Sequence, residues 1–159
     1  MTRKLLFVVF AVVGLAGLRP VTGLAADPPP VWNTDEAGVA IGGYDPVAYF
    51  EEGAATMGDP AVALEWNGAT WQFATEAHRD AFAAEPARYA PAYGGYCAYA
   101  MAKGAVAPTD PEDGWTVFEN RLYLNYSADV RERWRQSIPR YIDEANSNWP
   151  SISADLAAP

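Results

Sequence analysis

The chain has 159 residues, 50% of them hydrophobic and 13% aromatic, and 20 acidic residues against 11 basic ones give a formal net charge of −9. This length suits one domain with a sizeable core. An acidic surface repels phosphate backbones, so the composition argues against nucleic acid as a partner.

The first 26 residues have the three-part organisation of a secretory signal peptide. Arg3 and Lys4 precede an apolar run over 5–18, and small residues end the segment at Ala26. The run is shorter than the ~20 residues that span a bilayer. We therefore expect cleavage after Ala26, no stable membrane anchor and a periplasmic or secreted mature chain, with 8 basic and 20 acidic residues.

Three regions follow the expected cleavage site. Residues 27–38 hold three consecutive prolines and predict an extended linker, 39–150 form the expected globular domain, and 151–159 make a C-terminal tail. Near the start of the domain, the glycine-rich stretch from Gly42 to Pro46 predicts a turn.

A β-hairpin followed by a helix is the first strong pattern inside the domain. Alternating residues over 62–66 and 70–73 flank Asn67-Gly68, a dipeptide favoured in two-residue hairpin turns. Thr75 is the expected N-cap of the helix, and Pro86 ends it.

A second hairpin and helix are expected further along the chain. Strands over 115–118 and 122–126 flank Glu119-Asn120, and Ser127 is the expected N-cap of the following helix. Pro139 either kinks that helix or starts another one.

The two hairpin-and-helix patterns resemble each other. Aromatic residues, a hydroxyl cap and an arginine recur between 71–82 and 123–134 at a constant offset of 52. We interpret this as an internal duplication, although any capped amphipathic helix after a hairpin has a similar pattern. The expected fold class is α+β, built from two β-hairpin-plus-helix units with an aromatic Gly-Gly-Tyr-Cys helix between them.

The segment between the two units is dense in tyrosine, alanine and glycine. Gly94 and Gly95 allow a tight backbone turn. Residues 96–103 then predict a helix that ends at Gly104 and has Cys97 in its first turn.

Cys97 is the first candidate for chemistry. It is the only cysteine, so no internal disulfide can form, and the single histidine rules out the usual zinc sites within one chain. Unpaired N–H groups and the helix dipole in a first turn favour the thiolate, which binds soft metals or reacts with oxidants. A buried, inert cysteine is the alternative.

Met101 and His78 are the candidate second ligands. Met101 follows Cys97 by one helical turn, and Cys, Met and His suit Cu(I). Each also has a structural interpretation. Met101 would fill the core, and His78, which corresponds to the apolar Val130 in the offset of 52, would pack at the edge of the core.

Three tyrosines recur every third residue around the cysteine: Tyr93, Tyr96 and Tyr99. We expect them either to shield the thiol and donate hydrogen bonds to a thiolate, or to pack as aromatic residues under the Gly94-Gly95 turn.

Several motifs, spread over nearly the whole expected mature chain, carry a resemblance to a known family. They are G-Y-D-P-V-A-Y-F at 43–50, W-x-F at 71–73, R-D-A-F at 79–82, Y-x-P-x-Y-G-G-Y-C-A at 89–98, D-P at 110–111 and L-Y-L-N at 122–125. On these residues the chain resembles the YHS domain-containing exported proteins of bacteria, some of which are selenoproteins.

The resemblance implies a small α+β domain of hairpin-plus-helix units in a bacterial periplasm. YHS modules elsewhere accompany copper-transporting ATPases and metal-handling proteins, often with several cysteines, whereas this chain has one. In the selenoprotein relatives, selenocysteine stands where Cys97 stands here, which implies a chemically active position.

Three functions follow as expectations. The leading one is a periplasmic domain that binds or handles a soft metal ion such as copper through Cys97, with Met101 or His78, and without turnover. Its partner would be the metal ion or a periplasmic redox or metal-handling protein. The second is a single-cysteine thiol redox protein, which forms a sulfenic acid or a mixed disulfide. The third is an interaction module with an inert thiol.

Overall fold

Both expected hairpins form, and each is a separate two-stranded antiparallel sheet. The computed structural model describes residues 31–158, so the expected signal peptide and the start of the linker lie outside the described residues. Strand β1 (Asp59–Trp66) pairs with β2 (Ala69–Phe73), and β3 (Trp115–Phe118) pairs with β4 (Arg121–Leu124).

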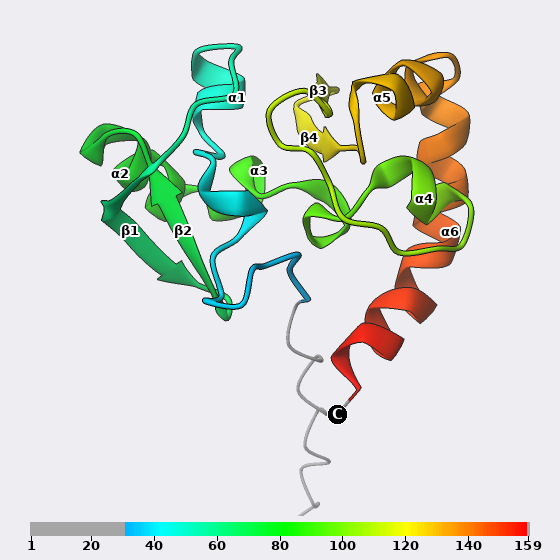
Figure 1. Ribbon diagram of the computed structural model, residues 1–159, viewed down its shortest axis with the longest axis horizontal. Coiled ribbons are helices and arrows are strands. Elements are labelled where there is room, and N and C mark those ends of the chain that lie inside the picture. Colours follow the sequence, from blue (N-terminus) through cyan, green and yellow to red (C-terminus); the bar gives the residue numbers. More distant parts are fainter. Residues whose placement is uncertain (1–30, 159) are drawn as a thin grey trace, which may run out of the picture.

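Helices and 3-10 turns make up the other regular elements of the described chain. They are η1 (Ile41–Gly43), α1 (Ala48–Glu51), α2 (Glu76–Ala84), α3 (Pro86–Tyr89), η2 (Ala92–Gly95), α4 (Ala98–Ala102), α5 (Ala128–Arg135) and α6 (Ile138–Ala157). The expected α+β fold class is thus confirmed (Figure 1). None of these helices is both long and apolar enough to cross a bilayer.

The two hairpin turns adopt the backbone conformation that the sequence predicts. Asn67 and Gly68 have φ angles of 56° and 83°, and Glu119 and Asn120 have φ angles of 47° and 57°. Positive φ at both central residues is typical of the turn whose twist matches that of paired strands. The non-glycine pair therefore replaces Asn-Gly at the cost of some backbone strain at Glu119.

The helices after the two hairpins are capped in the same way. Thr75 Oγ1 accepts a hydrogen bond from His78 N at 3.1 Å, and Ser127 Oγ accepts one from Val130 N at 3.3 Å. The aromatic residue seven positions after each cap is fully buried. Both N-caps are confirmed, while the internal duplication stays a hypothesis.

The helix around the cysteine is shorter than predicted. It covers Ala98–Ala102 instead of 96–103, and Cys97 is its N-cap with an extended backbone. Tyr96 is also extended, and Cys97 N donates a hydrogen bond to Ala107 O at 3.1 Å. Because this amide bonds to Ala107, outside the helix, the helix begins one residue after the cysteine.

The C-terminal region is helical. Pro139 stands in the first turn of α6, so it starts a second helix and does not kink a single long one. The helix continues through most of the region expected as a tail, past Pro150. Trp149 and Ile152 pack against the core on either side of that proline, and such packing stabilises a helix that its sequence alone would interrupt.

The described part of the expected linker packs on the domain. The Trp32 ring centre lies 5.0 Å from that of Trp71, and Trp32 Nε1 donates to Asn67 O at 3.0 Å. Asn33 N donates to Gly94 O at 2.7 Å. These contacts connect the N-terminal segment to both the first hairpin and the glycine turn.

Two clusters of buried side chains form the core, and the β3–β4 hairpin separates them. The first cluster includes Trp71 and Phe82 with Leu122 and Leu124 from one face of β4. The second lies against α4 and α6 and includes Tyr123 from the opposite face of β4. Alternation along this strand therefore joins the two halves of the molecule.

Candidate functional site

The Cys97 thiol is buried and serves as a helix cap. Its side chain is 1% exposed, and Sγ accepts a hydrogen bond from Ala100 N at 3.5 Å. The thiol in turn points to Asn125 Oδ1 at 3.9 Å. Sulfur thus takes the place that a serine or threonine oxygen has at most N-caps. The predicted proximity of the thiol to unpaired N–H groups is confirmed.

Asn125 is a polar residue in the core whose bonds the sequence did not predict. It is fully buried at the end of β4. Its Oδ1 accepts from Tyr99 N at 3.2 Å, and its Nδ2 donates to Gly114 O at 3.4 Å. The amide therefore holds the start of α4 against the turn before β3, and it shares Oδ1 with the Cys97 thiol.

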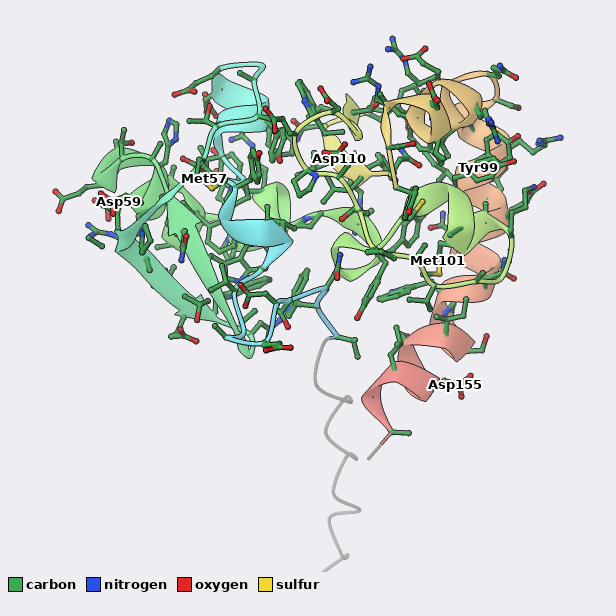
Figure 2. All side chains as sticks on the ribbon, viewed as in Figure 1. Met57, Asp59, Tyr99, Met101, Asp110 and Asp155 are labelled. Carbon is green, nitrogen blue, oxygen red and sulfur yellow. The ribbon has the colours of Figure 1, made fainter. Side chains whose placement is uncertain are left out.

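Met101 lies on α4 with its side chain fully buried in the second cluster. Met101 N donates to Cys97 O at 2.9 Å, and Met101 O accepts from Asn148 Nδ2 of α6 at 3.0 Å. The two sulfur-bearing residues are thus both buried, one helical turn apart. Figure 2 shows Tyr99 and Met101 on this side of the molecule.

The hydroxyls of two tyrosines beside the cysteine bond elsewhere than to the thiol. Tyr93 Oη donates to Asn146 Oδ1 at 3.0 Å, and Tyr96 Oη donates to Trp32 O at 3.5 Å. Burial raises the pKa of the Tyr93 phenol well above its usual range. The Tyr99 ring packs on Tyr141 with 5.2 Å between ring centres. Of the two roles expected for these tyrosines, aromatic packing is therefore the one that the structure supports.

Gly94 and Gly95 make the turn between Tyr93 and Tyr96. Their φ angles are 62° and 79°, in the region that favours glycine. A Cβ at Gly94 would overlap the carbonyl oxygen of Val31. Glycine is therefore required at Gly94 for the close approach of the N-terminal segment.

His78 lies far from Cys97 and contacts two carboxylates. It belongs to α2, on the opposite side of the molecule from α4 (Figure 1). Its Nδ1 lies 2.6 Å from Asp45 Oδ2, and its Nε2 lies 3.8 Å from Glu52 Oε1. The packing interpretation was thus incomplete, because the imidazole takes part in a polar contact. The structure does not bring His78 together with Cys97 or Met101.

Asp45 is the acceptor at the centre of that contact, and it is fully buried. Its Oδ1 accepts from Val47 N at 2.8 Å and Ala48 N at 3.3 Å, and its Oδ2 accepts from Ala74 N at 2.8 Å. An aspartate before a proline in a turn signals bonds to the next amides. Nothing local signals the second oxygen's bonds to the far end of β2 and to α2.

Metal ligands do not cluster in the region that the structure describes. Between residues 31 and 158, no group of three side chains from His, Cys, Asp and Glu is arranged to hold a metal ion. A soft metal at Cys97 would have Met101 as its nearby partner in the sequence, within apolar surroundings.

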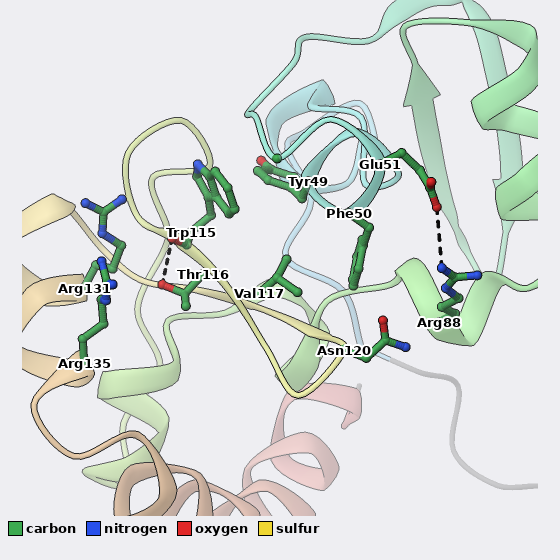
Figure 3. A pocket seen from close by; sticks show the side chains of 11 residues that line it. Tyr49, Phe50, Glu51, Arg88, Trp115, Thr116, Val117, Asn120, Arg131 and Arg135 are labelled. Carbon is green, nitrogen blue, oxygen red and sulfur yellow. Dashed lines mark hydrogen bonds and ion pairs between the residues drawn. The ribbon is translucent and has the colours of Figure 1, made fainter.

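A pocket of about 620 Å³ opens between the two halves of the domain. It lies between α1 and the β3–β4 hairpin, with Arg88 of α3 at one end and α5 at the other (Figure 3). Its apolar wall includes Phe50, Trp115 and Val117. The Trp115 ring centre lies 5.2 Å from that of Tyr49, so an aromatic pair forms the side of the pocket.

The two ends of the pocket carry arginines. At one end Arg88 pairs with Glu51 at 3.6 Å and with Glu85 at 3.5 Å. At the other end lie Arg131 and Arg135 of α5, one helical turn apart. Volume, aromatic walls and a few polar groups are features of small-molecule sites. The sequence analysis did not find this pocket, since its residues come from four separate elements.

The chain was compared with family models, with curated proteins and with solved structures, and no match was found in any of the three.

Proposed function

We propose that the protein is an exported binding module that takes a small ligand into the pocket between α1 and β3, without turnover. The observation that carries this proposal is the pocket itself. Its volume of about 620 Å³ falls in the range of ligand sites, about 300–1,000 Å³. It combines an apolar wall with arginines at both ends. Cys97 would then be structural, because its sulfur caps α4 and is 1% exposed.

The pocket is rigidly framed, which favours binding to a preformed site. Tyr49 is 2% exposed, and its hydroxyl donates to Pro111 O at 2.7 Å. The rings of Phe50 and Tyr89 pack edge to face with centres 5.5 Å apart. A ligand would therefore lose little binding energy to the ordering of these walls.

Fragment binding followed by NMR tests the proposal. A chemically mixed fragment library should shift the amide and indole signals of Trp115 and the amide signal of Phe50. A Val117→Phe variant should abolish the shifts because the added ring fills the pocket. Val106→Phe is the matched control, since Val106 is 44% exposed and lies outside the pocket. Shifts that persist in Val117→Phe, or a library that leaves Trp115 unshifted, would contradict the proposal.

Soft-metal binding at Cys97 and Met101 is the second candidate. It is supported by two buried sulfur-bearing residues one helical turn apart, and by the resemblance to modules that accompany copper transporters. In this proposal Cu(I) is the cargo, and Cys97 and Met101 would hold it through their sulfurs, which are soft ligands.

Chelator competition with Cu(I) and native mass spectrometry test this candidate. Cys97→Ser should abolish the mass shift of one copper, and Met101→Leu should weaken binding. His78→Gln should leave it unchanged, because His78 lies across the molecule next to Asp45. A wild-type protein that takes up no copper, or an equal loss in His78→Gln, would refute it.

A further inference from the structure

We propose that the ligand of this pocket carries a single carboxylate on an apolar body, with the carboxylate bound by Arg131 and Arg135. This inference rests on the proposed binding function and names the class of its ligand. It starts from the ion pairs at the α5 end of the pocket.

The two arginines of α5 share one carboxylate. Arg131 Nη2 lies 3.2 Å from Glu132 Oε1, and Arg135 Nη1 lies 3.3 Å from the same oxygen. No other carboxylate of the described residues is within ion-pair distance of either guanidinium. Two positive charges against one negative charge leave one positive charge at this end of the pocket.

The opposite end is neutralised. Arg88 has two carboxylate neighbours, and one of them, Glu51, lines the pocket itself. Figure 3 shows the Arg88–Glu51 pair on one side of Val117 and the two α5 arginines on the other. An anionic group is therefore favoured at the α5 end alone, and the ligand body would extend from there along Trp115 and Val117.

The charge distribution along the chain makes this end distinctive. Residues 31–113 carry 13 acidic and 3 basic side chains, whereas residues 115–141 carry 5 basic and 3 acidic ones. In a protein of net negative charge, the α5 end of the pocket thus lies in a segment with an excess of positive charge. Anions would be favoured at this segment over the acidic parts of the surface.

Arginine geometry indicates the type of anion. A guanidinium group presents two parallel N–H donors that match the two oxygens of a carboxylate. Arg131 is 26% exposed at its side chain, so a bond to it is partly shielded from water. One remaining positive charge matches one carboxylate, and the aromatic wall of Tyr49 and Trp115 matches an apolar or aromatic body.

Titration with three probes of the same shape tests the inference: 3-phenylpropionate, its amide and 3-phenylpropylamine. NMR shifts of Trp115 give each dissociation constant. We expect the acid to bind about tenfold more tightly than the neutral amide, because only the acid forms charge-assisted bonds. The amine should bind most weakly, and added salt should reduce the preference.

Substitutions in α5 test which arginines bind the carboxylate of the probe. Arg131→Gln or Arg135→Gln should lower the affinity for the acid to that for the amide, with thermal midpoints near the wild-type value. Arg133→Gln removes the same charge from the same helix but lies outside the pocket, so it should leave the preference intact. Glu132→Gln should strengthen binding of the acid, because both guanidinium groups lose their shared carboxylate.

The outcomes separate the ligand class from the binding function. If the amide binds as tightly as the acid, or if Arg133→Gln reduces the preference as much as Arg131→Gln does, the ligand class is overturned while the binding function stands. The class is also overturned if other fragments occupy the pocket and no phenylpropionate binds. If neither these probes nor the mixed library shift Trp115, the binding function itself fails.

Discussion

Replacing Asp45 tests whether the polar contact with His78 stabilises the first half of the domain. Asp45 is fully buried and accepts bonds from three backbone amides in addition to its contact with His78. Asp45→Ala leaves these donors without an acceptor. Each unsatisfied buried donor costs about 1–3 kcal/mol, so the three amides alone account for about 3 kcal/mol at the low end of that range. We therefore expect a loss of about 3–5 kcal/mol in the free energy of unfolding.

Urea unfolding followed by tryptophan fluorescence measures this loss. A fall of that size lowers the urea midpoint by about 2 M if the slope is near 2 kcal/mol/M. Asp35→Ala is the matched control, because Asp35 Oδ1 also accepts from two amides, of Ala37 and Val39, but the side chain is exposed. After this substitution water can bond to the two exposed amides, so we expect a loss of about 0.5–1.5 kcal/mol in the free energy of unfolding.

Asp45→Asn gives a finer test of the same contact. The amide keeps one oxygen for Val47 N but turns donors toward Ala74 N or His78, so its cost should fall between those of the two alanine variants. If Asp45→Ala costs no more than Asp35→Ala, the buried carboxylate does not hold α1, β2 and α2 together, and the reasoning is refuted.

Three further predictions concern the core and the thiol. Trp71→Ala should destabilise the protein by about 3–5 kcal/mol, since the ring is fully buried; an unchanged urea midpoint would contradict this. Burial raises the pKa of the Tyr49 phenol far above 10, so folding favours the neutral phenol. Stability should be complete below pH ~10 and fall above it. Tyr49→Phe should reduce that fall, and an equal slope in both proteins would refute it. Cys97, 1% exposed, should react with iodoacetamide far more slowly in buffer than in urea, and equal rates would show an accessible thiol.

The structural features that depend only on neighbouring residues were predicted correctly. Asn67-Gly68 specifies its turn through its own φ angles, and Thr75 and Ser127 cap helices by bonding to amides three positions on. These interactions need only the local chain, so the sequence carries them directly. The two hairpins and the two caps follow from such signals.

Contacts between distant residues were not predicted. The sequence analysis took His78 either as a second metal ligand or, by comparison with Val130, as a packing residue, yet its imidazole contacts a carboxylate 33 positions earlier. The helix of Cys97 was expected to start two residues too early, because the bond of Cys97 N to Ala107 O keeps its backbone extended. Both differences arise from partners that a local pattern does not contain.

The sequence by itself determined the α+β class, the order of the main elements, the single thiol and the acidic character of the chain. Arg131 and Arg135, which are four positions apart, share one face of α5 in the structure. Only the tertiary structure decided that this face meets α1 and β3 around a pocket, while Cys97 and His78 lie apart. Turns and caps depend on short-range hydrogen bonds, whereas a pocket depends on how separate helices and strands pack against one another, which arises from the burial of apolar surface over the whole chain.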